Sequence, residues 1–177
     1  YSQWGEANAT RSNARQGEVK GAATPPSFAE DAVSRLEITT LSEANPQMVA
    51  WARAERANHR SEAEFADAVM ARFADEFVYD TSIALPESDP LDTFFFESKR
   101  GYCSYFATSL ATILRAAGIE ANVVLGYMGG EWNEFGNFWS VRNADAHAWV
   151  EARLDGGAWQ RLDPTLLVMT ATTAPTV

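Results

Sequence analysis

Residues 101–118 read GYCSYFATSLATILRAAG, and this stretch decides the architecture of the chain. Its large apolar side chains recur at the spacing of a helix, and most of the others are small, so we predict a buried helix over residues 103–117. Gly118 comes next, where a glycine can end a helix in a left-handed turn. The predicted helix therefore starts at or within one residue of Cys103, the only cysteine of the chain.

A cysteine at a helix start is placed for nucleophilic chemistry. Unpaired backbone N–H groups and the positive end of the helix dipole favour a thiolate over a thiol. The same N–H groups would point at the oxyanion that forms when the sulfur attacks a carbonyl. Without such a context a cysteine more often fills space as a small hydrophobe, so residues elsewhere must decide between the two interpretations of Cys103. A single cysteine also excludes an intrachain disulfide.

After the helix the sequence changes to a strand pattern. Runs of alternating or β-branched residues are separated by turns rich in Gly, Asn or Asp, which is typical of strands. The connections are short, and this implies antiparallel pairing. The predicted strands cover residues 122–127, 138–141, 147–154 and 159–162.

The strand over residues 147–154 carries the candidate base. Its even-numbered residues are apolar and form one face, whereas its odd-numbered residues, from His147 to Arg153, point the other way. The His147 ring therefore avoids the most apolar face. A lone histidine is more often a satisfied polar residue than a base, and His59, in a polar connection between two helices, is expected to be only that.

Asp163 ends the next strand, and its carboxylate there could accept a hydrogen bond from the imidazole and fix its tautomer. The alternative is an ordinary turn aspartate. A two-residue loop within residues 155–158 would set Asp163 opposite Val150, facing away from His147. A three-residue loop with a left-handed glycine would set it across from Trp149, diagonal to His147 and within side-chain reach. We predict the odd-length loop, or a bulge with the same effect.

Two helices are predicted before the cysteine. Asn45-Pro46 has the form of an N-cap followed by proline at the first helical position. Ser61 and Glu64 form a capping box ahead of apolar residues at helical spacing. Residues 81–90 contain two prolines and predict a loop. The dense apolar patch within residues 91–96 should anchor the segment that leads to the cysteine.

The N-terminal part has a different character. Residues 1–26 are polar and small without periodicity, so we expect residues 1–30 to form a mobile or loosely docked arm before a domain over residues 31–170. Alternation over residues 34–40 predicts a short edge strand. The first residues lack the layout of a secretion signal, and no run is long and apolar enough to cross a bilayer. We interpret the chain, which begins at Tyr1, as a fragment or processed form.

Composition narrows the class of protein further. Of the 177 residues, 46% are apolar and 21% are charged, which fits one globular domain. The formal net charge of -10 argues against nucleic acid, because such binding needs Lys and Arg to neutralise phosphates. Cationic or neutral partners fit better. With only two histidines a zinc site would have to be carboxylate-rich. We expect neither a metal nor an organic cofactor, because the thiol supplies the chemistry.

Five motifs of the chain resemble, in their order and spacing, the bacterial transglutaminase-like family, especially its branch of extracytoplasmic domains in membrane proteins. The similarity runs from about Asn45 through Thr165. The motifs are Lys99-Arg100-Gly101-Tyr102-Cys103, Leu114-Arg115-Ala116-Ala117-Gly118-Ile119, Gly126-Tyr127-Met128-Gly129-Gly130-Glu131-Trp132-Asn133, Asp145-Ala146-His147-Ala148-Trp149-Val150-Glu151 and Trp159-Gln160-Arg161-Leu162-Asp163-Pro164-Thr165.

The resemblance implies an α+β, papain-like fold in which a cysteine-bearing helix packs on an antiparallel sheet. It also implies that Cys103, His147 and Asp163 are the catalytic nucleophile, base and orienting carboxylate, the roles indicated by their positions. One departure stands out: relatives usually follow the cysteine with glutamate and histidine, whereas this chain has Ser104 and Tyr105. The difference bears on local hydrogen bonding and on the choice of substrate.

Other residues are candidates for binding substrate. Glu131 and Asn133 follow a strand in a Gly-rich turn that borders the cleft in relatives, and the equally weighted alternative is a solvated turn in which Trp132 caps the core. The hydroxyls of Tyr102 and Tyr105 are candidates to contact the oxyanion, with plain packing as the alternative. Two tryptophans, Trp149 and Trp159, are expected to form core or cleft wall, and Trp149 is counted with the candidate substrate-binding residues.

The implied reaction is acyl transfer. The thiol attacks a glutamine carboxamide or related amide of a protein or peptide substrate, and an amine or water resolves the thioester. One alternative is a cysteine peptidase or amidase acting on wall-related peptides, and another is a non-catalytic binding or scaffolding module, against which the intact triad counts. The resemblance further implies a periplasmic or other extracytoplasmic location, as a domain tethered to a membrane in the full-length protein.

Overall fold

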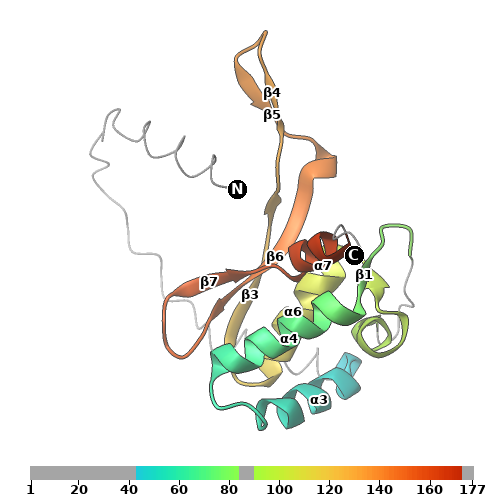
Figure 1. Ribbon diagram of the computed structural model, residues 1–177, viewed down its shortest axis with the longest axis vertical. Helices are drawn as coiled ribbons and strands as arrows, with labels where there is room; N and C mark the ends of the chain where they lie inside the picture. Colours follow the sequence, from blue (N-terminus) through green and yellow to red (C-terminus); the bar gives the residue numbers. More distant parts are fainter. Residues whose placement is uncertain (1–42, 84–89, 173–177) are drawn as a thin grey trace, which may run out of the picture. The chain divides into compact units, whose positions relative to one another are not determined.

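A computed structural model describes residues 43–83 and 90–172 of the chain. Its centre is a three-stranded sheet of β3 (Glu120–Tyr127), β6 (Ala146–Arg153) and β7 (Trp159–Leu162) in the order β3-β6-β7 (Figure 1). Both strand pairs are antiparallel, as predicted, although β3 pairs with β6 across residues 128–145 and only β6 and β7 are joined by a short connection. The arm expected over residues 1–30 and the strand expected over residues 34–40 lie outside the described residues, so the predicted domain boundary stays a prediction.

The helix that carries the cysteine, α6 (Cys103–Ala116), packs against β3 and β6 and so confirms the predicted α+β class. It ends one residue before the predicted end. Gly118 has φ +83°, and the N–H groups of Gly118 and Ile119 donate to Arg115 O at 3.0 Å and Leu114 O at 2.9 Å. This paired C-terminal motif needs the left-handed conformation that glycine adopts freely. The turn at Gly118 therefore directs the chain straight into β3.

Helix α3 (Pro46–Arg56) begins on a proline as predicted, but its cap differs from the expectation. Asn45 makes no side-chain cap bond to the helix. Its Oδ1 accepts hydrogen bonds from Leu91 N at 3.0 Å and Asp92 N at 3.3 Å. The Asp92 carboxylate in turn accepts from Gln47 N at 2.9 Å and Met48 N at 2.7 Å. Asp92 thus caps the helix in place of Asn45, because the Asn45 side chain accepts hydrogen bonds from the backbone of the segment that contains Asp92.

Helix α4 (Glu62–Glu76) follows the predicted serine N-cap. Ser61 Oγ accepts from Glu64 N at 3.0 Å, which is half of a capping box. The Glu64 carboxylate reaches one residue further and accepts from Arg60 N at 2.8 Å. Both interactions satisfy N–H groups that have no acceptor inside the helix.

An aromatic cluster joins α4 to the segment before the cysteine. Phe73 lies 4.8–6.5 Å, between ring centroids, from four other phenylalanines. Two of these rings come from the π-helix η1 (Thr93–Ser98), which continues the short α5 (Pro90–Asp92) and confirms the predicted apolar patch. The neighbours of Phe73 are Phe77, Phe94, Phe95 and Phe106.

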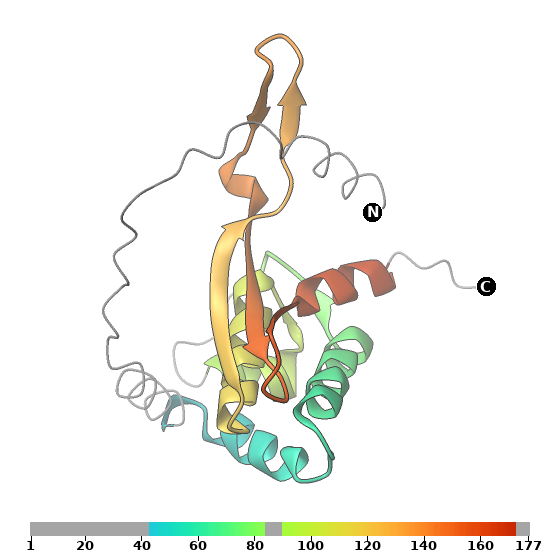
Figure 2. The same ribbon diagram turned by 90° about the vertical axis from the view of Figure 1, so that its left-hand side faces the viewer.

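The chain between β3 and β6 forms a hairpin that the sequence predicted only in part. The strand expected from residue 138 is present as β5 (Phe138–Ser140), but Glu131–Asn133, expected as a turn, is a strand, β4, paired with β5. Trp132, considered as a cap on the core, is 44% exposed and packs against Trp139 instead. Figure 2 shows this orange hairpin extending beyond the ends of β3 and β6. The cross-strand tryptophan pair explains why these residues form strands.

Four further elements lie in the described part of the chain. Strands β1 (Val78–Tyr79) and β2 (Arg100–Gly101) pair in parallel, and the 3₁₀ turn η2 (Asn143–Asp145) precedes β6. Helix α7 (Pro164–Thr172) follows β7. No helix within residues 43–83 and 90–172 is long and apolar enough to span a membrane.

Candidate active site

The register between β6 and β7 brings His147 and Asp163 to the same face of the sheet. Arg153 pairs with Trp159 and Val150 pairs with Leu162, so the next position sets Trp149 level with Asp163, as the odd-length loop predicted. The connection spans residues 154–158, five residues instead of three. Asp155 and Gly156 both have left-handed φ values, and Gly157 N donates to Leu154 O at 2.9 Å. Two consecutive left-handed residues closed by this hydrogen bond form the tight turn whose backbone twist matches that of the two flanking strands.

Asp163 accepts hydrogen bonds from three sides. His147 Nε2 lies 2.9 Å from Oδ2, and the two residues are only 6% and 8% exposed. Arg161 donates to the same oxygen at 2.9 Å, and Leu166 N, in the first turn of α7, donates to Oδ1 at 3.4 Å. A carboxylate only accepts, so Nε2 carries the proton of this bond and Nδ1 keeps a lone pair. Nδ1 is therefore the nitrogen available to take a proton from a thiol.

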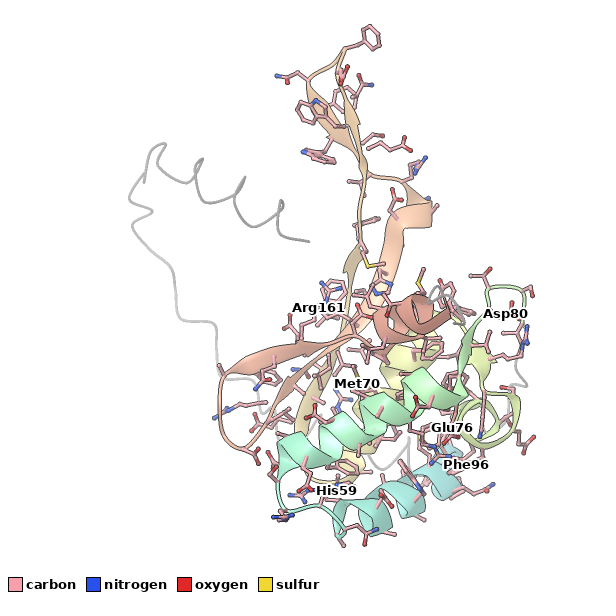
Figure 3. All side chains as sticks on the ribbon, in the orientation of Figure 1. His59, Met70, Glu76, Asp80, Phe96 and Arg161 are labelled. Atoms are coloured by element: carbon pink, nitrogen blue, oxygen red, sulfur yellow. The ribbon has the colours of Figure 1, made fainter. Side chains whose placement is uncertain are left out.

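Trp149 and Arg161 hold this pair from the side. The Trp149 ring lies 6.3 Å from the His147 ring at an interplanar angle of 21°, and Arg161 Cζ lies 4.3 Å from the centroid of the Trp149 ring. A Cβ on Gly126 would approach Trp149 Cη2 to 2.6 Å, so only glycine leaves the indole its place. Arg161 lies where β7 leads into α7 (Figure 3). These contacts fit the prediction that Trp149 forms part of the wall of the cleft. Arg161 was not identified from the sequence as a site residue.

Cys103 lies at the end of α6 that is level with His147. The helix has 14 residues and spans about 21 Å at ~1.5 Å per residue. Residues 117–119 join the C-terminal end of the helix to β3. The six residue steps of β3 from Glu120 to Gly126 cover about 20 Å, which is nearly the length of the helix. Gly126 pairs with His147. Among the described residues no hydrogen bond joins the thiol to His147, and such bonds often tighten only when substrate binds.

A tyrosine that the sequence did not single out lies beside the cysteine. Tyr79 pairs with Gly101, two residues before Cys103, and Asp80 N donates to Gly101 O at 2.8 Å. The pKa of Tyr79 is raised, first by burial and then by the charge of the nearby Cys103 sulfur. A two-residue strand gives no alternation from which its position could have been predicted.

The predicted substrate-binding residues fall into two groups. Tyr102 and Tyr105 flank the cysteine, with ring centroids 4.9 Å apart, and burial followed by the neighbouring Tyr102 raises the pKa of Tyr105. Glu131 and Asn133 lie on the hairpin: Glu131 is 3.3 Å from Arg142, and Asn133 Oδ1 accepts from Gly136 N at 2.9 Å. The structure thus separates the hairpin candidates from the tyrosines. The binding role of these four residues, like that of Trp149, stays a prediction.

Among residues 43–83 and 90–172, the other histidine does not build a second centre of this kind. His59 is 3.2 Å from Glu55 Oε1 in the connection between α3 and α4, away from Arg161 in Figure 3, as expected of a satisfied polar histidine. Within the described ranges no three His, Cys, Asp or Glu side chains gather in a way that could hold a metal ion.

A cysteine at the start of a central helix, level with a hydrogen-bonded His–Asp pair on an antiparallel sheet, defines the papain-like class of α+β folds. The chain belongs to the transglutaminase-like superfamily, whose family model matches residues 49–164. This confirms the predicted family, fold class and enzyme class.

Named relatives agree with this assignment. The chain is 40% identical over 125 residues to a protein-glutamine gamma-glutamyltransferase of Pseudomonas aeruginosa, a match that covers 70% of the chain but 19% of that relative. It is 40% identical over 96 residues to the protein YebA of Bacillus subtilis, covering 50% of the chain and 13% of YebA. The chain therefore spans less than a fifth of the curated relatives that it matches.

A solved structure gives the same result in three dimensions. The periplasmic domain of TgpA from Pseudomonas aeruginosa superposes with a TM-score of 0.70 at 37% identity, over 79% of this chain and 49% of that one. The ethylmercury-bound form of the same domain gives 0.68 at 38% identity, over 73% and 47% of the two chains. The predicted extracytoplasmic location is confirmed by these periplasmic counterparts.

Proposed function

We propose that the domain transfers acyl groups from the glutamine carboxamide of a protein or peptide, through a thioester on Cys103. The observation that carries the proposal is the hydrogen bond between buried His147 Nε2 and Asp163 Oδ2, formed at the end of the sheet that is level with the thiol. A neutral imidazole held through Nε2 presents Nδ1 as a base. The name of the Pseudomonas aeruginosa relative supports glutamine as the acyl donor.

Each residue has one role in the proposed reaction. His147 Nδ1 takes the thiol proton, and Cys103 Sγ attacks the carboxamide carbon, which gives a tetrahedral oxyanion. Tyr105 N and Phe106 N already donate to Tyr102 O, so the N–H groups at the very start of α6 are those that face the oxyanion. The imidazolium returns its proton to the leaving nitrogen, and ammonia departs as the thioester forms.

The thioester is resolved by a second nucleophile. A primary amine gives a substituted amide and restores the thiol, whereas water gives the carboxylic acid, which for glutamine is glutamate. Asp163 keeps its charge throughout and stabilises the imidazolium that exists in both half-reactions. We also propose that the domain is held at a membrane by parts of a longer protein, since its solved counterparts are periplasmic domains.

The test is incorporation of a fluorescent primary amine into a glutamine-containing peptide, with released ammonia measured in parallel. We expect wild-type protein to release ammonia and Cys103→Ala to release none above background. Glu97→Gln is the control variant, because Glu97 is exposed and has no role in the proposed reaction. Cleavage of peptide bonds without ammonia release would select the peptidase alternative, and Cys103→Ala at full activity would exclude thiol catalysis altogether.

A further inference from the structure

The hairpin β4–β5 carries large apolar side chains that the fold leaves exposed. Trp132 and Trp139 pair across the strands with ring centroids 5.6 Å apart, and Phe135, at the tip, is fully exposed. A shallow depression on the hairpin is lined by Glu131, Trp132, Asn133, Glu134, Phe135 and Ser140. We call the following six residues the hairpin surface: Glu131, Trp132, Glu134, Phe135, Phe138 and Trp139. An exposed aromatic cluster of this kind is typical of an interaction site.

The backbone of the hairpin is also open to a partner. In the described part of the chain β4 and β5 form a sheet of two strands, and no third strand pairs with the outer edge of β4. Such an edge accepts an extended segment as an additional strand, with main-chain hydrogen bonds supplying affinity and alternate side chains supplying specificity.

The charge of the hairpin indicates the chemistry of that partner. Residues 128–145 contain three carboxylates, Glu131, Glu134 and Asp145, against one guanidinium, Arg142, and no lysine. Arg142 lies 3.3 Å from Glu131 and 3.6 Å from Asp145, so one guanidinium is shared by two carboxylates and residues 128–145 keep a negative excess. Faces of tryptophan rings attract cations as well. An anionic lipid surface or a second copy of this chain, which carries a net charge of -10, would be repelled.

The hairpin rises from the end of the sheet that carries the candidate base. Gly126 pairs with His147, and the next link is the hydrogen bond from Met128 N to Asp145 O at 2.7 Å. Five residue steps separate Gly126 from Glu131, a distance of at most about 17 Å. A segment bound on the hairpin therefore lies within several extended residues of the active-site end.

We propose that the hairpin surface docks an extended lysine- or arginine-bearing segment of the protein substrate along the edge of β4, the strand that carries Glu131. The proposal rests on the proposed function only in naming this partner as substrate. Backbone pairing to β4 aligns the segment, its cationic side chains contact Glu131 and Glu134, and its remaining side chains pack on the aromatic rings. The docked segment then leads toward the start of α6, where the thiol lies.

The test measures binding without catalysis. The 177-residue chain with Cys103→Ala is titrated into a short fluorescein-labelled peptide in which lysine alternates with threonine. Fluorescence anisotropy should show binding that weakens as salt is added. A peptide with glutamate in place of lysine should not bind. The double variant Glu131→Gln/Glu134→Gln should weaken binding of the lysine peptide about fivefold or more.

A matched control separates local from overall charge. Glu97→Gln/Glu120→Gln removes the same charge from exposed carboxylates off the hairpin, and Glu120 lies at the opposite end of β3. This control should change affinity less than twofold. Equal losses in both double variants would show that only net charge matters and would overturn the docking site.

Two further outcomes would assign the surface to another occupant. Binding to vesicles of phosphatidylcholine and phosphatidylglycerol that is lost in Phe135→Ser, without peptide binding, would identify a membrane contact. A concentration-dependent dimer disrupted by the same substitution would identify self-association. Peptide binding in a protein that shows no acyl transfer would leave the docking site standing and remove the proposed function. Acyl transfer without hairpin-dependent binding would do the reverse.

Discussion

The substitution Asp163→Asn tests the central contact of the site at nearly constant shape. The asparagine oxygen can still accept from His147 and Arg161, so the loss is mainly that of the negative charge 2.9 Å from His147 Nε2. With charge centres about 4 Å apart and an effective dielectric constant near 20, that charge stabilises an imidazolium by about 4 kcal/mol. At about 1.4 kcal/mol per factor of ten, kcat should fall about 10³-fold.

The assay is ammonia release from a glutamine peptide at saturating substrate, with urea unfolding measured on the same preparations. Asp163→Asn should lower the free energy of unfolding by only about 1–2 kcal/mol, because the Arg161 side chain is 46% exposed and the bond from Leu166 N is long. Asp155→Asn is the matched control. Its carboxylate accepts from Glu62 N and Ala63 N far from the thiol, so kcat should stay within about twofold of wild type.

The reasoning would be refuted by a folded Asp163→Asn protein that keeps more than a tenth of wild-type kcat. That result would mean that the imidazolium is not formed in the rate-limiting step, or that His147 is not the base. An equal fall in Asp155→Asn would show instead that the assay reports stability.

Three further predictions concern the surroundings of the site and the core. In Gly126→Ala the new Cβ would lie 2.6 Å from the Trp149 indole and force the ring to move. We expect kcat to fall about tenfold in the ammonia assay and the free energy of unfolding to fall by about 1–3 kcal/mol. An unchanged kcat would contradict the supporting role of the indole. Phe73→Ala empties the centre of the aromatic cluster and should lower the free energy of unfolding by about 3–5 kcal/mol in urea titrations, whereas exposed Phe138→Ala should change it by less than about 0.5 kcal/mol. The pKa of Asp80 is lowered to about 2, first by hydrogen bonds from Ser82. The contribution of this carboxylate to stability is therefore present above its ordinary pKa of 3.8 and is lost as the pH falls toward 2. An NMR titration of the Asp80 carboxyl carbon with a midpoint near 3.8 would contradict this.

The parts of the fold that the sequence predicted are those governed by local rules. Helix α6 has apolar residues at helical spacing and a glycine where its C-terminal turn needs a left-handed residue, so its ends were predicted within one residue. The predicted contact between His147 and Asp163 required an odd-length loop between β6 and β7, since a shift of one residue moves a strand's side chains to the other face, and the register confirms that loop. Both predictions needed only short-range information.

The missed features depend on distant neighbours. Asn45 has the sequence of an N-cap, yet backbone N–H groups of residues 91 and 92 take its side chain. Strand β4 has only three residues and depends on its pairing with β5. The glycines directly before it favoured the prediction of a turn. Arg161 precedes Asp163 by two residues on one face of β7, a spacing that could have suggested its role once the strand was assigned.

The two halves of the site are held by different kinds of structure. His147 lies in β6 and Asp163 directly follows β7, so the pairing of these two strands fixes their separation and a change of register would remove the contact entirely. Cys103 belongs to a helix that joins the sheet at its far end through residues 117–119, so the position of its sulfur depends on packing along the whole of α6. Packing permits small adjustments that strand register does not. A shift of α6 along the sheet would therefore change the separation between the thiol and the imidazole but would leave the contact between the imidazole and the carboxylate intact.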